Sequence, residues 1–123
     1  MDQVAGFYDR HPYPPPVENL DRYAAAWRDG RQRRIEHARI WPTIPYRDDH
    51  RILVAGCGTS QAAKYAVRYP EAPVVGIDVS ESSLAHARSL RELHRLDNLE
   101  LHHCPIEEVA SVGTAFDHVV CTG

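Results

Sequence analysis

One short segment constrains the fold of this chain more than any other. Residues 52–55 (Ile-Leu-Val-Ala) are apolar and typical of a strand, and the next five residues are Gly-Cys-Gly-Thr-Ser. Two closely spaced glycines after a strand are typical of a tight turn, because glycine adopts backbone angles that other residues avoid. A strand without alternating polar residues is buried on both faces, as in a parallel sheet. The segment therefore predicts a strand–turn–helix unit of an α/β protein.

Strand and helix patterns alternate through the whole second half of the chain. Leu84, Ala87, Leu90 and Leu93 recur at helical spacing, so we expect them on the buried face of one helix. Alternation of strands and helices with short connections predicts parallel strands joined by right-handed crossovers. The predicted strands are 51–55, 73–77, 99–102 and 116–121, and the predicted helices are 61–69, 80–96 and, as a short helix or turn, 107–112.

Residues 1–50 have a different composition, with six of the nine prolines and no strand pattern. Proline fixes its own φ and disfavours helix in the preceding residue, so we expect a stiff arm around residues 11–16. Two helices are predicted at 19–27 and 31–41, the second with Ile35, Ala38 and Trp41 on its buried face. We therefore divide the chain into a helical, Pro-rich N-terminal arm (1–50) and an α/β domain (51–123).

Composition and charge exclude several classes of protein. With 43% hydrophobic and 25% charged residues, the 123-residue chain has ordinary globular composition, which excludes a disordered tail, a coiled coil and a collagen-like chain. The net charge of −3 gives no overall basic footprint for nucleic acid or membrane. A local arginine cluster leaves nucleic-acid binding as an alternative, although we favour a solvated helix face. The cluster comprises Arg28, Arg31, Arg33, Arg34 and Arg39.

The three cysteines and the first residues of the chain bear on its location. The cysteines lack CxxC spacing, so we expect small buried thiols rather than disulfides or a metal site. No basic segment followed by an apolar one opens the chain, and no apolar run is long enough to span a membrane. We therefore expect a cytoplasmic protein without membrane contact.

A single carboxylate indicates what the glycine turn binds. Asp78 ends the second predicted strand, 22 residues after Gly56. Ligands of open α/β sheets bind at the carboxyl ends of the strands, where an acid accepts hydrogen bonds from ribose hydroxyls. The start of the next helix adds backbone N–H groups. These features predict a nucleoside-containing ligand. A nicotinamide-dependent oxidoreductase fits less well, because Gln61 occupies the third glycine position of the dinucleotide fingerprint.

Four segments resemble a known family. Gly56–Ser60 (Gly-Cys-Gly-Thr-Ser) resembles motif I of the class I S-adenosylmethionine-dependent methyltransferases, and 75–80 resembles their second strand. Residues 103–108 occupy the place of the family's adenine-side segment, and 116–121 resembles its fourth strand. The resemblance implies a Rossmann-like parallel sheet in the order 3-2-1-4 with helices on both faces. It also implies S-adenosylmethionine as cofactor and S-adenosylhomocysteine as product.

The resemblance also implies roles for individual residues. The glycine turn faces the methionine part of the cofactor, Asp78 binds the ribose, and Val79 and Ile106 flank the adenine. No catalytic residue is implied, because methyl transfer often needs only proximity and orientation. The cofactor-binding residues implied are Ala55, Gly56, Cys57, Gly58, Gln61, Asp78, Val79, Pro105, Ile106 and Cys121.

Class I methyltransferases usually form a seven-stranded sheet, whereas this sequence ends just after the fourth predicted strand. We therefore expect the cofactor-binding half of a methyltransferase, apparently truncated, with an unidentified methyl acceptor. The fourth strand becomes an edge with unpaired backbone groups, which favours a homodimer through that edge or through exchanged elements. The alternative is a non-catalytic fragment or dimerisation module with the same fold.

Overall fold

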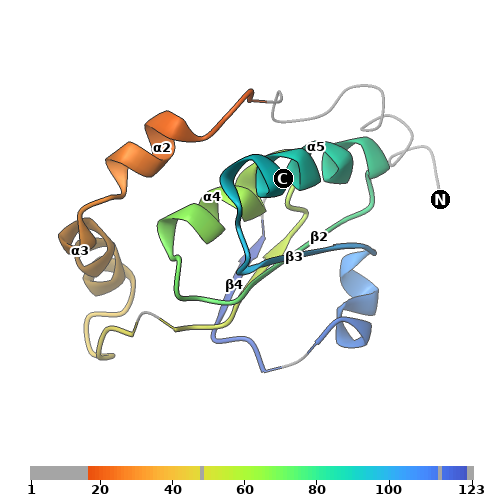
Figure 1. Cartoon of the computed structure of the whole chain (residues 1–123). Helices are drawn as coiled ribbons and strands as arrows, with labels where there is room; N and C mark the ends of the chain where they lie inside the picture. Colours follow the sequence, from red (N-terminus) through yellow and green to blue (C-terminus); the bar gives the residue numbers. More distant parts are fainter. Residues whose placement is uncertain (1–16, 48, 114, 122–123) are drawn as a thin grey trace.

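The computed structural model describes residues 17–47, 49–113 and 115–121. The stiff arm predicted around residues 11–16 lies outside the described residues. Within the described part, four parallel strands form one sheet in the order β3-β2-β1-β4, which confirms the predicted order (Figure 1). The strands are β1 (Ile52–Ala55), β2 (Val74–Asp78), β3 (Leu99–His103) and β4 (His118–Cys121).

The strand register brings the carboxyl ends of all four strands to one edge of the sheet. Ala55, the last residue of β1, lies opposite Ile77 of β2 and Cys121 of β4. Asp78, the last residue of β2, lies opposite His103, the last residue of β3. The segments that follow these strands therefore meet at this edge, where open α/β sheets bind their ligands.

Helices cover both faces of the sheet, as predicted. α4 (Gln61–Arg68) and α5 (Glu81–His94) lie over one face, and the short 3-10 helix η1 (Ile106–Ser111) lies on the other (Figure 1). Ser80 caps α5, because its hydroxyl accepts a hydrogen bond from the Ser83 N–H at 3.2 Å. Observed element bounds differ from the predicted ones by at most two residues.

One predicted core position of α5 is wrong. Leu84, Ala87 and Leu90 are buried, but Leu93 is 60% exposed. A spacing of three residues falls short of the helical repeat of 3.6, so each step turns the side chain about 60° around the helix. After three such steps Leu93 lies on the side of α5 opposite Leu84.

The core is aliphatic on both faces of the central strands. Ile52, Val54 and Val74 pack beneath α4 and α5. The intervening β1 and β2 residues form a smaller cluster with Cys104 on the other face, namely Leu53, Ala55, Val75 and Ile77. The uninterrupted apolar pattern of these strands thus reflects burial on both sides, as predicted.

α4 packs on β2 at closest range where the strand has a glycine. A Cβ at Gly76 would lie 2.6 Å from the Ala62 Cβ and 3.0 Å from a Leu101 methyl. Close helix–strand packing is what the third glycine of a dinucleotide fingerprint provides. In this chain, Gly76 and Ala62 provide it instead, and Gln61 stays half-buried at the start of the helix.

The N-terminal helices α2 (Asp21–Ala26) and α3 (Gly30–Ile40) pack beside the sheet domain, α2 against α4. The prediction for the buried face of α3 is wrong: Ile35 is 50% exposed and Ala38 is also exposed, whereas His37 is buried. The reason is an aromatic cluster in which the His37 ring lies 5.3 Å from the Trp41 ring. The other rings of this cluster are those of Tyr46, His50 and His118. None of the helices in the described ranges is long and apolar enough to cross a membrane.

Candidate functional site

The glycine turn after β1 has the conformation that its sequence predicts. Gly56 and Gly58 have φ values of 66° and 60°, in the left-handed region that favours glycine. Cys57 between them is buried, and its N–H donates to the Ile77 carbonyl at 3.0 Å. The Gln61 N–H donates to the Cys57 carbonyl at 3.2 Å, which connects the turn to α4. The turn therefore leaves the backbone at Gly56 exposed at the carboxyl edge of the sheet.

Two backbone hydrogen bonds fix the carboxylate of Asp78. Its Oδ2 accepts from the Gly58 N–H at 2.7 Å, and its Oδ1 accepts from the Ser80 N–H at 2.8 Å. A carboxylate offers about four acceptor positions, roughly two on each oxygen. One position on each oxygen therefore remains for a ligand. Two acceptors on neighbouring oxygens match the two hydroxyls of a ribose.

The side chain of Cys57 belongs to the core rather than to the site surface. Burial and, to a smaller extent, the charge of Asp78 raise the pKa of the Cys57 thiol to about 12. Its Sγ lies 3.7 Å from the Gly58 carbonyl oxygen, to which the thiol donates. A thiol with this pKa is not a nucleophile at neutral pH. The backbone of Cys57 is buried with it, and its N–H and carbonyl form the hydrogen bonds to Ile77 and Gln61.

The other two cysteines differ from each other. Cys104 is buried as predicted, and burial raises the pKa of its thiol. Cys121 is exposed, so the prediction of a buried residue is wrong there. The difference arises because Cys121 ends the edge strand β4, whose residues alternate between half-buried and exposed. Among the described residues, no group of three or more His, Cys, Asp or Glu side chains has a metal-binding arrangement.

The structure brings the remaining predicted site residues to the same edge. Val79 follows Asp78 and is half-buried. Pro105 precedes η1 and Ile106 begins it with 49% exposure. Cys104 links this segment to the site, because its N–H donates to the Asp78 carbonyl at 3.0 Å.

Sequence reasoning missed one contact at this edge. The His103 ring lies with Nε2 2.9 Å from the Val79 carbonyl oxygen and Nδ1 2.8 Å from a Glu81 carboxylate oxygen. His102, the preceding residue of β3, pairs instead with Glu100. The only sequence signal for the contact is the position of His103 at the strand end opposite Asp78.

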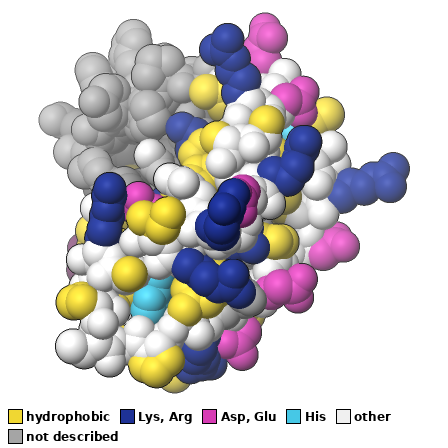
Figure 2. Space-filling view, turned by 90° about the vertical axis from the view of Figure 1, so that its left-hand side faces the viewer, with side chains coloured by type: hydrophobic (Ala, Val, Ile, Leu, Met, Phe, Trp, Pro, Cys, Tyr) yellow, Lys and Arg dark blue, Asp and Glu magenta, His cyan; other side chains and the backbone are white. Residues whose placement is uncertain are grey.

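The arginine cluster of α3 is largely engaged within the chain. Arg31 and Arg39 pair with Asp29 and Glu36, at 2.9 and 3.5 Å. Arg33 donates to the Trp27 carbonyl, and the Arg34 guanidinium lies 5.5 Å from the Tyr46 ring centroid. Figure 2 shows acidic and apolar side chains between the basic ones on this side of the molecule. The surface thus resembles a solvated helix face with mixed charge.

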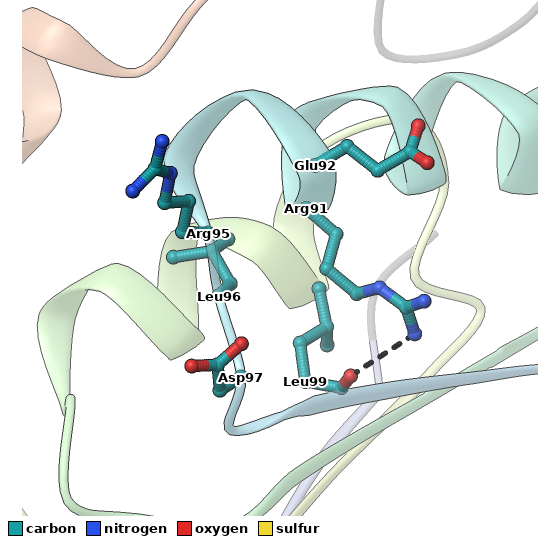
Figure 3. Close-up of a pocket in the computed structure, with 6 residues that line it drawn as sticks. All are labelled: Arg91, Glu92, Arg95, Leu96, Asp97 and Leu99. Carbon is teal, nitrogen blue, oxygen red and sulfur yellow. Dashed lines mark hydrogen bonds between the residues drawn. The ribbon is translucent and has the colours of Figure 1, made fainter.

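A separate depression lies at the opposite edge of the sheet, between the end of α5 and the start of β3 (Figure 3). Arg91 donates to the carbonyl of Leu99, the first residue of β3, at 3.4 Å. Glu92 and Arg95 point away from each other, so the polar groups do not converge on one point. We assign no function to this depression.

Comparisons with known proteins agree with this geometry. The family described as "Methyltransferase domain" matches residues 47–123, which is more than half of the chain. Over 87 residues the chain is 40% identical to the "Uncharacterized phycocyanin operon protein W" of Pseudanabaena tenuis (strain PCC 7409). This match covers 69% of the chain and 80% of that protein.

Solved structures share the fold over part of this chain. The N-terminal domain of EvdMO1 with SAH bound is 27% identical with a TM-score of 0.57. That match covers 76% of this chain and 38% of that chain. PKMT2 from Rickettsia typhi in complex with AdoHcy is 23% identical with a TM-score of 0.55, covering 64% of this chain and 16% of that chain. The chain therefore spans well under half of these two proteins.

Proposed function

Because this chain belongs to the methyltransferase domain family, we propose that it binds S-adenosylmethionine and supports transfer of the methyl group to an acceptor. The carboxylate of Asp78 carries the proposal, since backbone N–H groups of Gly58 and Ser80 orient it at the carboxyl edge of the sheet. S-adenosylhomocysteine is the expected product. The proposal covers the cofactor-binding part, and the acceptor remains to be identified.

The residues present fit this cofactor. Asp78 keeps an acceptor position on each oxygen for the two ribose hydroxyls. Gly56, with positive φ and an exposed backbone, allows a ligand to approach without a Cβ in the way. The N-terminal turn of α4 adds N–H groups that favour an anionic group such as the methionine carboxylate.

The proposed contacts follow the cofactor along the edge of the sheet. The backbone from Ala55 to Gly58 and the start of α4 at Gln61 face the methionine part. Val79 and Ile106 flank the adenine, with Pro105 beside Ile106. Cys121, at the end of β4, borders the methionine side because it lies opposite Ala55 in the register.

The chain contributes binding and orientation in this mechanism. When bound, the cofactor supplies an electrophilic methyl group on a sulfonium sulfur. Asp78 would hold the ribose and the glycine turn the methionine part, which lie on either side of the sulfonium, so the reactive methyl would keep one position at the sheet edge. Cys57 does not serve as nucleophile or base, because its thiol is buried and stays protonated. We assign no catalytic residue.

Calorimetric titration with S-adenosylmethionine and S-adenosylhomocysteine, with NAD as control, tests the proposal. We expect micromolar binding of the first two and none of NAD. Asp78→Ala removes the two carboxylate oxygens that accept from the ribose hydroxyls. Two charge-assisted hydrogen bonds are lost, so we expect a loss in affinity of about 100-fold.

Asp117→Ala is the matched control. Asp117 also accepts a backbone hydrogen bond, from the Arg51 N–H at 2.8 Å, but it precedes β4 at the opposite edge of the sheet. We expect Asp117→Ala to leave affinity unchanged. Equal affinity of the wild-type chain and Asp78→Ala would overturn the ribose assignment, and a folded chain that binds neither compound would overturn the cofactor proposal.

One observation favours the alternative of a dimerisation module. In the described part of the sheet β4 pairs only with β1, and Val119 on β4 is 52% exposed. A homodimer through this edge remains a proposal, tested by the mass in solution of Val119→Lys and wild-type chains.

The free cysteines support a proposed cytoplasmic location, and the engaged arginines of α3 favour partners other than nucleic acid.

A further inference from the structure

The peptide that joins Val79 to Ser80 is held at both of its polar ends. Its carbonyl accepts a hydrogen bond from His103 Nε2 at 2.9 Å, and its N–H donates to Asp78 Oδ1 at 2.8 Å. Because a peptide unit is planar, a bond that fixes the carbonyl also fixes the direction of the N–H. His103 therefore sets the direction of one of the two hydrogen bonds that orient Asp78.

The His103 ring is itself anchored. Its Nδ1 lies 2.8 Å from Glu81 Oε1, and Glu81 is the first residue of α5. The imidazolium form has an N–H on each ring nitrogen and can donate to both acceptors. The backbone adds a third link, because the Cys104 N–H donates to the Asp78 carbonyl. The end of β3 thus holds the end of β2 and the start of α5 together.

We propose that His103 is a positioning residue of the cofactor site, which acts through the Val79–Ser80 peptide on the carboxylate of Asp78. This inference rests on the function proposed above. His103 does not touch the ribose in this arrangement. It restricts rotation of the peptide, so that both oxygens of Asp78 stay oriented before the ligand arrives.

The expected effect of removing His103 is moderate. Without the ring, the Gly58 N–H still binds Asp78 Oδ2 at 2.7 Å, so the carboxylate keeps one of its two backbone bonds. We expect His103→Ala to weaken S-adenosylhomocysteine binding by about 3- to 10-fold, the scale of one hydrogen bond. His103→Gln retains an amide donor and should recover part of this loss.

His102 provides a matched control. It is the neighbouring residue of β3 and also pairs with a glutamate, Glu100, but it does so on the other face of the sheet. We expect His102→Ala to bind S-adenosylhomocysteine as the wild-type chain does.

Two measurements separate positioning from a general effect on folding. The first is affinity for S-adenosylhomocysteine and for its 2′-deoxy analogue, which lacks one of the two hydroxyls proposed to donate hydrogen bonds to Asp78. The loss caused by His103→Ala should be smaller for the analogue. An equal loss for both ligands, or no loss for either, overturns the proposal.

The second measurement is hydrogen exchange of the Ser80 amide in the ligand-free chain, followed by nuclear magnetic resonance. We expect faster exchange in His103→Ala and not in His102→Ala. Unchanged exchange at Ser80 overturns the positioning role of His103. This readout needs no cofactor, so it separates the proposed function from the positioning role of His103. A wild-type chain that binds no S-adenosylhomocysteine refutes the proposed function, whereas the exchange rate at Ser80 still tests whether His103 fixes the Val79–Ser80 peptide.

Discussion

The sheet domain and the N-terminal helices are stabilised by different kinds of contact. In the sheet domain, strands β1 and β2 are buried on both faces among aliphatic side chains. In the helical part, residues 17–47, isoleucines lie half-exposed at the surface while rings and cations pack inside. Ile35, Ile40 and Ile44 are each at least 50% exposed.

The two regions are linked by Leu20, which is buried in the core cluster beneath α4 and α5, and by Arg68 of α4. The Arg68 guanidinium carbon lies 3.8 Å from the ring centroid of Trp27 and 5.2 Å from that of Tyr69. The side chain is only 15% exposed, and Glu36 of α3 lies 3.8 Å away. Cation–π and ion-pair contacts thus add to the aliphatic packing of Leu20 where the helices meet the sheet domain. Regions with few buried aliphatic contacts open more easily, so we expect the helical part to be the less stable of the two.

Gly76→Ala should produce the largest effect, because it breaks the tight packing of the sheet domain. The added methyl would lie 2.6 Å from the Ala62 Cβ, so α4 must shift away from β2. We expect a loss of about 1–3 kcal/mol in the free energy of unfolding, measured by urea titration with circular dichroism.

Gly30→Ala is the control from the helical part. An added Cβ there meets only the flexible end of Arg33, at 3.3 Å. Because alanine is a better helix former than glycine, we expect unchanged or slightly higher stability. Equal destabilisation by the two substitutions would mean that the two regions do not differ in packing as described.

Arg68→Met should produce a smaller effect, confined to the attachment of the helices. Methionine keeps most of the apolar volume but removes the charge over the rings, a change of about 1–2 kcal/mol. Both tryptophans of the chain, Trp27 and Trp41, lie in the helical part and contact Arg68 and His118 of the sheet domain, so their fluorescence reports on that region and its attachment. We expect the fluorescence transition in urea to shift further than the transition followed by circular dichroism.

Arg39→Met provides the comparison for this variant. Arg39 also pairs with Glu36, at 3.5 Å, but its side chain is 73% exposed. Exposed ion pairs contribute little, so we expect a change below about 0.5 kcal/mol. If Arg39→Met and Arg68→Met shift the fluorescence transition equally, the ring contacts of Arg68 are not what attaches the helices.

The same difference explains which parts of the structure the sequence predicts. The apolar run at 52–55 and the two glycines after it predict β1, the turn and the start of α4, because local backbone preference and burial agree there. The prediction for α3 is wrong because it places Ile35 and Ala38 inside, whereas the aromatic cluster selects His37. A hydropathy pattern does not show ring–ring contacts between distant segments.

The site shows the same limit. Asp78 can be predicted from its place after a strand, since the carboxyl ends of parallel strands meet at one edge. The contact of His103 with Val79 and Glu81 cannot be predicted from the sequence, because it depends on the register of β2 and β3 and on where α5 begins. Such positioning contacts need three segments in place at once.

The smallest predicted effect is a pH dependence at the junction of the two regions. His118 of β4 packs against Trp41 with ring centroids 4.8 Å apart. Burial, and then the nearby charges of His50 and Arg68, lower the pKa of His118 below its ordinary value. The unfolded chain therefore takes up the proton at higher pH than the folded chain does. The stability that the neutral, buried His118 contributes is therefore fully present above about pH 6.5, and it is lost as the pH falls toward the lowered pKa.

His118→Phe tests this dependence, because phenylalanine keeps a ring against Trp41 but has no proton to gain. Urea titrations at pH 7.5 and 5.5, followed by tryptophan fluorescence, should show a smaller loss of stability on acidification for His118→Phe than for the wild-type chain. His102→Phe, a histidine of β3 outside the aromatic cluster, should keep the wild-type difference between the two pH values. If His118→Phe loses as much stability as the wild-type chain, burial of His118 does not couple the junction to pH. Protonation of His118 in the wild-type chain should loosen the helices before the sheet, since its ring contacts Trp41 of the helical part.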